Sequence, residues 1–375
     1  MRLLDRYLLR ELLLPLAYCL VGFLISFIAF DLFSQISEFQ KNKMTGGDIL
    51  EYYLYKTPEF LVTSYVLPMS LLLALLYALT NHARHNELTA MRAAAIPLGR
   101  IALPYFAVGV VLSLFVLFVN EQVVPDSVDA AERVLLRHAA NQPKAVAKIW
   151  QRNVTFLNAV ANRTWIIGAY HLQANVMINP QFNWRLEDGR RVQFIAEQAR
   201  WVGRRWVFTN VTRMEYAADT GAVADILKTN QMIFPGLAET PRIIKSEIKI
   251  GAIDSLKNMR KAQLSSLEIL DYLRLHPTLD PEQSARLHTK LQNRLAEPWI
   301  CLVVVLIAVP FGSLPGRRNV FVGVASSIFI CFAFLILKDL TLALGSGGFV
   351  PPWLAAWSPN ALFATTGLVL MWRVR

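Results

Sequence analysis

The sequence predicts an α-helical integral membrane protein with six transmembrane helices and a β-rich, jelly-roll-like domain inserted between the third and fourth helices. Of its 375 residues, 54% are hydrophobic and 17% are charged. Such a chain is too apolar for an ordinary soluble protein and too charged to lie wholly in a membrane. Long apolar runs occupy both ends of the chain, and a polar block from 120 to 297 separates them. We therefore expect this block to lie outside the membrane.

The first apolar run covers about residues 12–33, which is long enough to cross the hydrocarbon core of a bilayer. Arg2, Arg6 and Arg10 precede it, as in a signal peptide. The run is too long for that role, however, and no small-residue cleavage site follows it. We interpret it as an uncleaved transmembrane helix.

Two further runs, 60–79 and 101–119, complete the first membrane group. In the polar stretch before them, a short helix is expected to begin at Asp48. Pro68 is expected to kink the second transmembrane helix, because proline lacks a backbone donor.

Residues 80–100 are polar and charged, and they predict a small helix outside the bilayer at about 81–96. Thr80 or Asn81 is expected to cap its start, and Pro97 is expected to end it.

Leu88, Met91 and Ala95 form an apolar face on this helix, and Glu87 lies beside that face. The residues alone leave two interpretations open: a solvated loop, or a docking helix for a soluble partner.

Basic residues in the short loops predict the orientation, because they are enriched on the cytoplasmic side. Both termini and the loops at 80–100 and 315–319 are rich in arginine. The loops on the opposite side carry only Lys41, Lys43, Lys56 and Lys338. Both termini are therefore expected in the cytoplasm, and the polar block in the periplasm of a bacterium.

Within the polar block, apolar and polar residues alternate as they do in strands. Asp188-Gly189 predicts one hairpin, and the segment 201–208 predicts another. Further strand candidates are 154–157, 164–169, 176–179, 192–196, 211–216 and 243–250. These short strands predict a β-sandwich or a jelly roll, and periodicity does not choose between the two.

Helical patterns return after the strands. Ser265 with Glu268 fits a capping box, and Asp280 with Pro281 fits the start of a second helix. This second helix is expected to be a rigid stalk whose apolar stripe leads into the membrane, formed by Ser284, Leu287, Leu291 and Leu295.

Three apolar runs complete the membrane part, at about 299–314, 320–344 and 353–372. The first is short and contains Pro310, so it is expected to need part of the preceding helix, and a turn at 315–319 follows it. Lys338 and Asp339 interrupt the second run. We interpret them as a pair near the outer interface in preference to a substrate site.

The resulting domain plan places transmembrane helices 1 to 3 in 1–119, a β-rich domain in 120–264, a helical connector in 265–297 and transmembrane helices 4 to 6 in 298–375.

Several classes of function find no support in the residues. The net charge of +11 is not gathered in basic runs interleaved with aromatic residues, so no nucleic-acid partner is expected. There is no Walker motif and no recognisable catalytic set, so the chain itself is expected to bind no ATP, metal or other cofactor. Cys19, Cys301 and Cys331 all lie in membrane runs, which leaves the polar block without a disulfide.

Four segments together resemble the LptF/LptG permeases of lipopolysaccharide transport, also called YjgP/YjgQ. They are Leu-Asp-Arg-Tyr at 4–7, Asn-Glu-Leu-Thr-Ala-Met-Arg-Ala-Ala at 86–94, Ala-Val-Pro-Phe-Gly at 308–312 and Pro-Pro-Trp-Leu-Ala-Ala-Trp-Ser-Pro-Asn at 351–360. The resemblance covers essentially the whole chain, and the amino terminus is slightly more similar to LptG.

The resemblance implies one half of a transporter in the bacterial inner membrane, paired with a paralogous permease and an LptB-like ATPase dimer. The ATPase would hold ATP and Mg. The permease pair would extract lipopolysaccharide, and the β-rich domains would pass it to LptC and LptA-like proteins.

By the same resemblance, Glu87 is the acidic residue of a coupling helix seated in a groove of the ATPase. Arg84, Leu88 and Met91 would lie beside it.

For lipid phosphates, the resemblance points to Lys41 and Lys43, with Asp31 where a positive charge is expected. Lys338 is a third candidate for lipid binding, on the physical ground that an ammonium near a membrane surface attracts phosphate.

Other classes fit less well. A membrane-anchored periplasmic adaptor explains the polar block but not six spans. A lipid-modifying enzyme lacks a site, and a proton-coupled transporter would need more buried ionisable groups.

Overall fold

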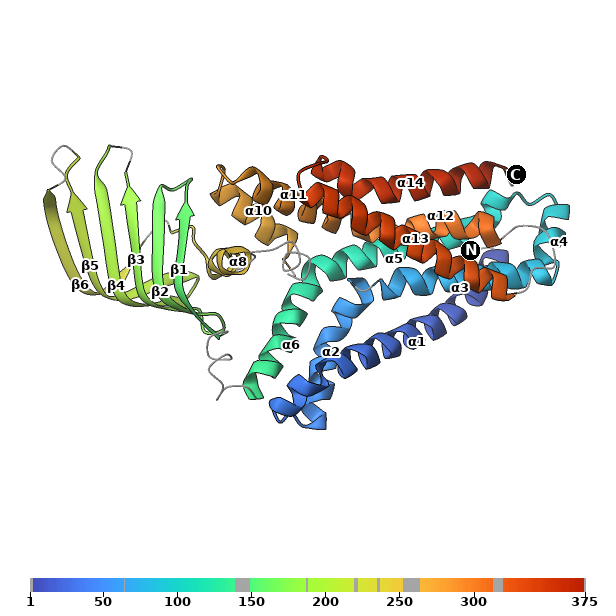
Figure 1. Ribbon diagram of the computed structural model, residues 1–375, viewed down its shortest axis with the longest axis horizontal. Helices are drawn as coiled ribbons and strands as arrows, with labels where there is room; N and C mark the ends of the chain where they lie inside the picture. Colours follow the sequence, from blue (N-terminus) through green and yellow to red (C-terminus); the bar gives the residue numbers. More distant parts are fainter. Residues whose placement is uncertain are drawn as a thin grey trace. The chain divides into compact units, whose positions relative to one another are not determined.

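A computed structural model describes residues 3–63, 65–138, 149–186, 188–218, 222–234, 237–251, 264–312 and 320–373. The chain divides into two compact units (Figure 1). The helical unit comprises Met1–Val134 with Ala285–Arg375, and the β unit comprises Leu135–Ser284. The predicted turn at 315–319 lies outside the described residues.

The first half of the helical unit begins with a single long helix. The elements of this half are α1 (Leu3–Lys41), α2 (Gly46–Val62), α3 (Val66–Arg84), α4 (Glu87–Ala93), α5 (Leu98–Phe118), the π turn η1 (Val119–Val123) and α6 (Val124–His138). Thr45 and Asp48 form a complete capping box at the start of α2, which begins close to the predicted Asp48.

The second half consists of α11 (Pro281–Ala296), the 3₁₀ turn η2 (Glu297–Trp299), α12 (Ile300–Gly312), α13 (Val320–Ser346) and α14 (Pro352–Arg373). Within the described residues, six helical segments are long and apolar enough to cross a membrane. They are Leu3–Lys41, Val66–Arg84, Leu98–Arg137, Pro281–Gly312, Ile328–Ser346 and Pro352–Arg373. The prediction of six spans is confirmed, and the fourth span does include the helix that precedes it.

The α12 helix packs against α3, α5 and α14, and glycines allow the close approach. A Cβ atom at Gly109 of α5 would lie 2.9 Å from the Val305 side chain. At Gly367 of α14 it would lie 2.6 Å from the carbonyl oxygen of Leu306. Small residues at such contacts are typical of helix packing in membranes, where close packing replaces the hydrophobic effect.

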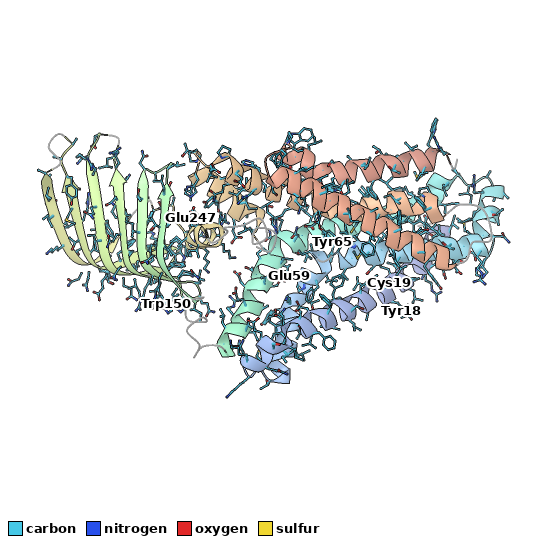
Figure 2. All side chains as sticks on the ribbon, viewed as in Figure 1. Tyr18, Cys19, Glu59, Tyr65, Trp150 and Glu247 are labelled. Carbon is cyan, nitrogen blue, oxygen red and sulfur yellow. The ribbon has the colours of Figure 1, made fainter. Side chains whose placement is uncertain are left out.

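The outward side of α1 is apolar and exposed. Tyr18 is 72% exposed, and Figure 2 labels it on this helix. The opposite side carries Leu8, Leu12 and Leu16, which are buried against α3 at four-residue spacing. A helix with one apolar face packed and the other uncovered fits a lipid environment.

The predicted kink at Pro68 is wrong. The helix stops at Val62 and restarts at Val66, and Tyr65 between them adopts the left-handed conformation with φ +59°. Pro68 is then the third residue of α3, in the first turn, where a missing backbone N–H breaks no helical hydrogen bond.

The β unit contains one six-stranded antiparallel sheet in the order β1 to β6 among the described residues. Its strands are β1 (Trp150–Asn158), β2 (Arg163–His171), β3 (Val176–Arg185), β4 (Arg191–Val202), β5 (Arg205–Tyr216) and β6 (Val223–Ile233). Sequential neighbours pair throughout, so the described strands form a meander. The prediction of a β-rich insert between the third and fourth spans is confirmed.

A crease runs across all six strands. The register is the same on both sides of it, but pairing is interrupted along one row, which comprises Asn153, Gly168, Asn179, Glu197, Asn210 and Asn230. Between β3 and β4 the interruption also includes Pro180 and Ala196. The asparagines of β1, β3 and β5 in this row have φ near +50°. Such a residue shifts the alternation of the strand by one position, so the apolar residues stay on one face. Figure 1 shows the strands curving along their length.

Aromatic rings form a continuous row on the buried face of the sheet. Trp165, Phe182, Phe194 and Phe208 come from four successive strands, with ring centroids 4.6–5.0 Å apart. Cross-strand aromatic pairs of this kind stabilise a sheet beyond the area they bury.

The predicted strand at 243–250 is wrong, because these residues lie in the helix α8 (Pro241–Gly251). The Thr240 side chain accepts a hydrogen bond from the Ile243 backbone N–H, and Pro241 stands at the first helical position. Ile244 packs into the aromatic core of the sheet.

The helix starts predicted after the strands are confirmed. α10 (Ser266–Leu275) has the Ser265–Glu268 capping box, and Asp280 accepts hydrogen bonds at the start of α11. Within the predicted apolar stripe on α11, Leu287 is buried and Leu295 is exposed. The buried positions of α11 are Leu287, Thr289, Arg294 and Ala296.

Candidate functional site

The candidate site is the turn that joins α3 to α4. α3 continues through Thr80 and Asn81, so the predicted cap at these residues is wrong. The break comes at Asn86, which adopts φ +56° while its carbonyl accepts the first hydrogen bond of α4. Asparagine tolerates this left-handed conformation better than most residues. A second left-handed residue, Ala95, ends the turn before Pro97.

Glu87 opens α4 and is held by two neighbouring helices. Its Oε2 accepts a hydrogen bond from the Tyr7 hydroxyl of α1 at 2.9 Å, and it lies 2.7 Å from Nδ1 of His82 on α3. The Glu87 side chain is 36% exposed, whereas His82 is 1% exposed. The carboxylate is thus fixed in orientation while one side still faces outward.

Electrostatics keep this carboxylate charged. Partial burial acts to raise the pKa of Glu87, but the hydrogen bonds from His82 and Tyr7 and the nearby imidazoles of His82 and His85 lower it overall. A carboxylate with a lowered pKa stays ionised at neutral pH, so this turn presents a permanent negative charge.

The structure gathers the four predicted coupling residues at one turn but gives them different surroundings. Arg84, three residues before Glu87 in the sequence, is exposed. Leu88 is buried and Met91 partly buried against the core of the helical unit, so both support α4 from within. The outward surface of α4 is formed by the small side chains Thr89, Ala90 and Ala93 with Arg92.

Tyr7 and His82 are parts of this site that the sequence did not identify. Tyr7 belongs to the Leu-Asp-Arg-Tyr segment at 4–7, and His82 lies in the last turn of α3. A tyrosine near the amino terminus and a histidine at the same membrane boundary were the available signals. From the sequence alone, neither residue can be assigned a contact with Glu87.

A second cluster surrounds Lys338 of α13. Its Nζ lies 3.1 Å from Glu297 Oε1 of η2 and donates a hydrogen bond to the Tyr65 hydroxyl. Nζ also lies 4.4 Å from the centroid of the Tyr65 ring. Lys338 is buried, and its carboxylate partner Glu297 comes from another span.

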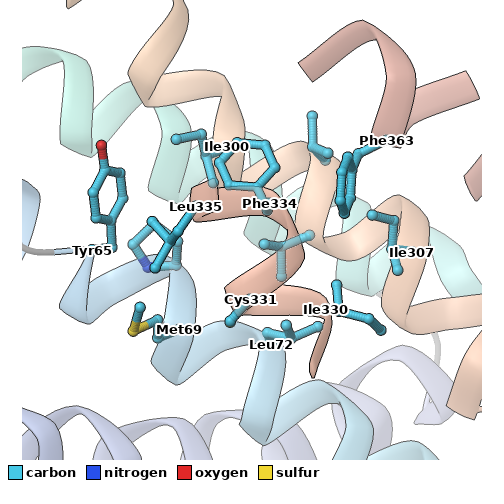
Figure 3. A pocket seen from close by; sticks show the side chains of 13 residues that line it. Tyr65, Met69, Leu72, Ile300, Ile307, Ile330, Cys331, Phe334, Leu335 and Phe363 are labelled. Carbon is cyan, nitrogen blue, oxygen red and sulfur yellow. The ribbon is translucent and has the colours of Figure 1, made fainter. Parts of the chain in front are cut away.

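An apolar pocket adjoins this cluster, and Tyr65 stands at one end of it (Figure 3). α3, α12, α13 and α14 all contribute to its walls. The lining residues are Tyr65, Pro68, Met69, Leu72, Ile300, Val303, Val304, Ile307, Ile330, Cys331, Phe334, Leu335 and Phe363. The lining is apolar apart from the Tyr65 hydroxyl and the Cys331 thiol, and it offers no set of groups for catalysis.

The two remaining lysine candidates, Lys41 and Lys43, are exposed. Lys41 ends α1 and Lys43 lies in the following turn. Neither forms an ion pair with the residues that the structure describes. Asp31, in contrast, is 3.1 Å from Lys56 of α2 and also accepts a hydrogen bond from Tyr53. Its charge is therefore compensated within the chain.

Metal ligands are not clustered in the part of the chain that the structure describes. No group of three or more histidine, cysteine or acidic side chains there could hold a metal ion. The cysteines Cys19, Cys301 and Cys331 are free.

A family model matches residues 6–373, which is nearly the whole chain. Its description is "Lipopolysaccharide export system permease LptF/LptG". The model covers LptF and LptG together, so the lean towards LptG stays a prediction. A search of curated proteins found no match. The match and the six spans around a β domain agree: the chain belongs to the LptF/LptG family, as a multi-pass membrane permease component of lipopolysaccharide export.

Proposed function

We propose that this protein is the membrane subunit of an ATP-driven, ABC-type transporter that extracts lipopolysaccharide from the inner membrane and passes it through its β unit towards the outer membrane. The observation that carries the proposal is α4, a short helix between two spans. Its charged Glu87 is held by Tyr7 and His82, and its side chain is still 36% exposed. An outward surface of small side chains next to this carboxylate suits a groove on a partner.

The proposed partners follow from the family. An LptB-like ATPase dimer would bind α4 and supply ATP and Mg, while this chain binds no cofactor. A paralogous LptF/LptG-type permease would complete the transporter, and LptC and LptA-like proteins would receive the lipid.

We place both termini in the cytoplasm and the β unit in the periplasm. Figure 1 supports the first part, because the two termini and α4 lie at the same end of the helical unit. The arginine-rich termini and turn at that end are typical of cytoplasmic loops.

In this scheme, closure of the ATPase dimer moves α4, and the spans attached to it reshape a lipid cavity between the two permeases. The ATPase can shift the equilibrium between two conformations of the permease only by the difference between its binding free energies for those conformations. Lys41 and Lys43 are the proposed contacts for lipid phosphates, because their ammonium groups have no carboxylate partner among the described residues. Lys338 would first have to leave Glu297.

The proposal is tested by purifying the tagged chain in mild detergent from its native membrane and identifying the proteins and lipid that accompany it. Glu87→Gln and Glu87→Ala are compared with Glu38→Gln, which removes an exposed acid from the far end of α1.

A soluble ATPase, a second six-span chain and lipopolysaccharide should accompany the unaltered protein and the Glu38→Gln variant. The Glu87 variants should lose the ATPase or lose transport after reconstitution. Recovery of the unaltered chain alone, or only with periplasmic proteins, would favour an adaptor without transport activity. Normal transport by both Glu87 variants would remove the coupling role of this residue.

A further inference from the structure

The amino-terminal turns of α1 are tied to the α4 segment at two points. The Tyr7 hydroxyl donates a hydrogen bond to Glu87 at 2.9 Å, at the start of α4. Asp5 forms an ion pair with Arg100 of α5: Nη1 lies 2.8 Å from Oδ1, and Nη2 donates a hydrogen bond to Oδ2 at 3.0 Å. Glu87 is the first residue of α4 and Arg100 follows α4 in the chain, so one turn of α1 contacts the segment 87–100 at both of its ends.

Neither tie resembles a loose surface contact. The Asp5 and Arg100 side chains are 14% and 27% exposed, and Arg100 Nη2 donates a hydrogen bond to Asp5 Oδ2. A hydrogen bond between charged groups is stronger than one between neutral groups. One turn further on, Leu8 and Leu12 are completely buried. The polar contacts of Asp5 and Tyr7 therefore lie next to the apolar contact that Leu8 and Leu12 make with α3.

His82 adds a link to α3. Its Nδ1 contacts the same Glu87 oxygen that accepts the Tyr7 hydrogen bond, and its ring lies 5.6 Å from the Tyr7 ring. Its Nε2 is buried and makes no hydrogen bond with the described residues. The carboxylate of Glu87 is thus the point at which α1, α3 and α4 meet.

We infer that Tyr7 is a positioning residue for Glu87, and that Tyr7 and the Asp5–Arg100 pair transmit movement of α4 to α1. This inference rests on the proposed coupling role of Glu87 and names the helix that receives the movement. α1 suits this role because it is an unbroken helix from Leu3 to Lys41, roughly 58 Å long at 1.5 Å per residue. At its other end, Asp31 joins it to Lys56 of α2.

The first test compares Tyr7→Phe with Tyr18→Phe in the complete complex, reconstituted in vesicles that contain lipopolysaccharide. Tyr7→Phe keeps the ring against His82 and removes only the hydroxyl. Tyr18 is a matched control, since it lies on the exposed face of the same helix.

Tyr7→Phe should lower the lipopolysaccharide released per ATP hydrolysed by about tenfold, the size expected for one hydrogen bond to a charged group. The amount of copurified ATPase should stay unchanged, and the melting temperature should fall by no more than a few degrees, because one hydrogen bond is lost from the fold. Every property of Tyr18→Phe should stay unchanged. Unchanged release per ATP in Tyr7→Phe would overturn the inference.

A double-mutant cycle separates positioning from general structure. If Tyr7 acts through Glu87, adding Tyr7→Phe to Glu87→Ala should reduce transport no further. If the double variant shows the product of the two single losses of transport, the two residues act independently and Tyr7 does not position Glu87. If Glu87→Ala alone transports normally, the proposed function of Glu87 fails. If Glu87→Ala loses transport while Tyr7→Phe transports normally, the proposed function of Glu87 is retained and only the inference about Tyr7 is rejected.

The second tie is tested by exchanging its charges. Asp5→Arg and Arg100→Asp should each lower release per ATP, and the double exchange should restore at least half of it because the pair can form in reverse. Failure of the double exchange, in a complex that assembles and melts normally, would exclude this pair from the transmission.

Discussion

Lys338 of α13 and Glu297 of η2 form a buried ion pair, with 3.1 Å between Nζ and Oε1. The two residues belong to different spans, and Tyr65, from the break between α2 and α3, completes the cluster. Three separate parts of the helical unit therefore meet at one charged contact. A buried charge that loses its partner is far more costly than the intact pair.

The first prediction concerns this pair. Lys338→Gln and Glu297→Gln should each destabilise the protein, by about 3–5 kcal/mol if the remaining charge stays buried. Thermal unfolding in detergent, followed by tryptophan fluorescence, measures the effect. Lys41→Gln is the control, because Lys41 is exposed and should leave the melting temperature unchanged. Equal melting temperatures for all three variants would mean that the pair contributes nothing to stability.

The second prediction concerns Glu239, which is completely buried in the β unit. Its carboxylate accepts hydrogen bonds from Asn158, Arg163 and Trp165, at 2.7, 3.2 and 3.2 Å. Glu239→Ala leaves the Arg163 guanidinium without its carboxylate and should cost about 3–5 kcal/mol. Limited proteolysis of the whole protein should show faster cleavage within 150–233. Arg190→Ala, at an exposed ion pair, is the control and should cost little.

The third prediction concerns the crease of the β sheet. Asn210 has φ +51°, which a β-branched residue adopts only with strain. Asn210→Val should therefore destabilise the protein by about 1–2 kcal/mol, whereas Asn210→Gly should be tolerated. Chemical denaturation followed by circular dichroism compares the two. A valine variant as stable as the glycine variant would show that the crease does not depend on backbone conformation at this position.

The fourth prediction concerns the packing of α14 on α12. A Cβ at Gly367 would lie 2.6 Å from the Leu306 carbonyl oxygen, so Gly367→Leu must push the two helices apart. The expected cost is about 1–3 kcal/mol or more. Gly22→Leu on α1 is the matched control, because nothing lies within 4 Å of the added Cβ. Melting temperatures in detergent should fall for Gly367→Leu only.

The membrane spans, the starts of α10 and α11 and the family motifs were accessible from the sequence, because each depends on residues close together in the chain. About twenty apolar residues predict a span wherever they occur. Ser265 with Glu268 predicts a helix start, because a capping box uses only the first turn.

Tertiary structure decided the features that depend on distant residues. The strand β6 was not predicted, because it is exposed on both faces and lacks the usual alternation. The segment 243–250 became a helix although it resembled a strand, because Ile244 packs into a core built by other strands. Only the folded chain decided that Lys338 meets Glu297 and that Glu87 meets Tyr7, 80 residues away, since periodicity carries no information about contacts between elements.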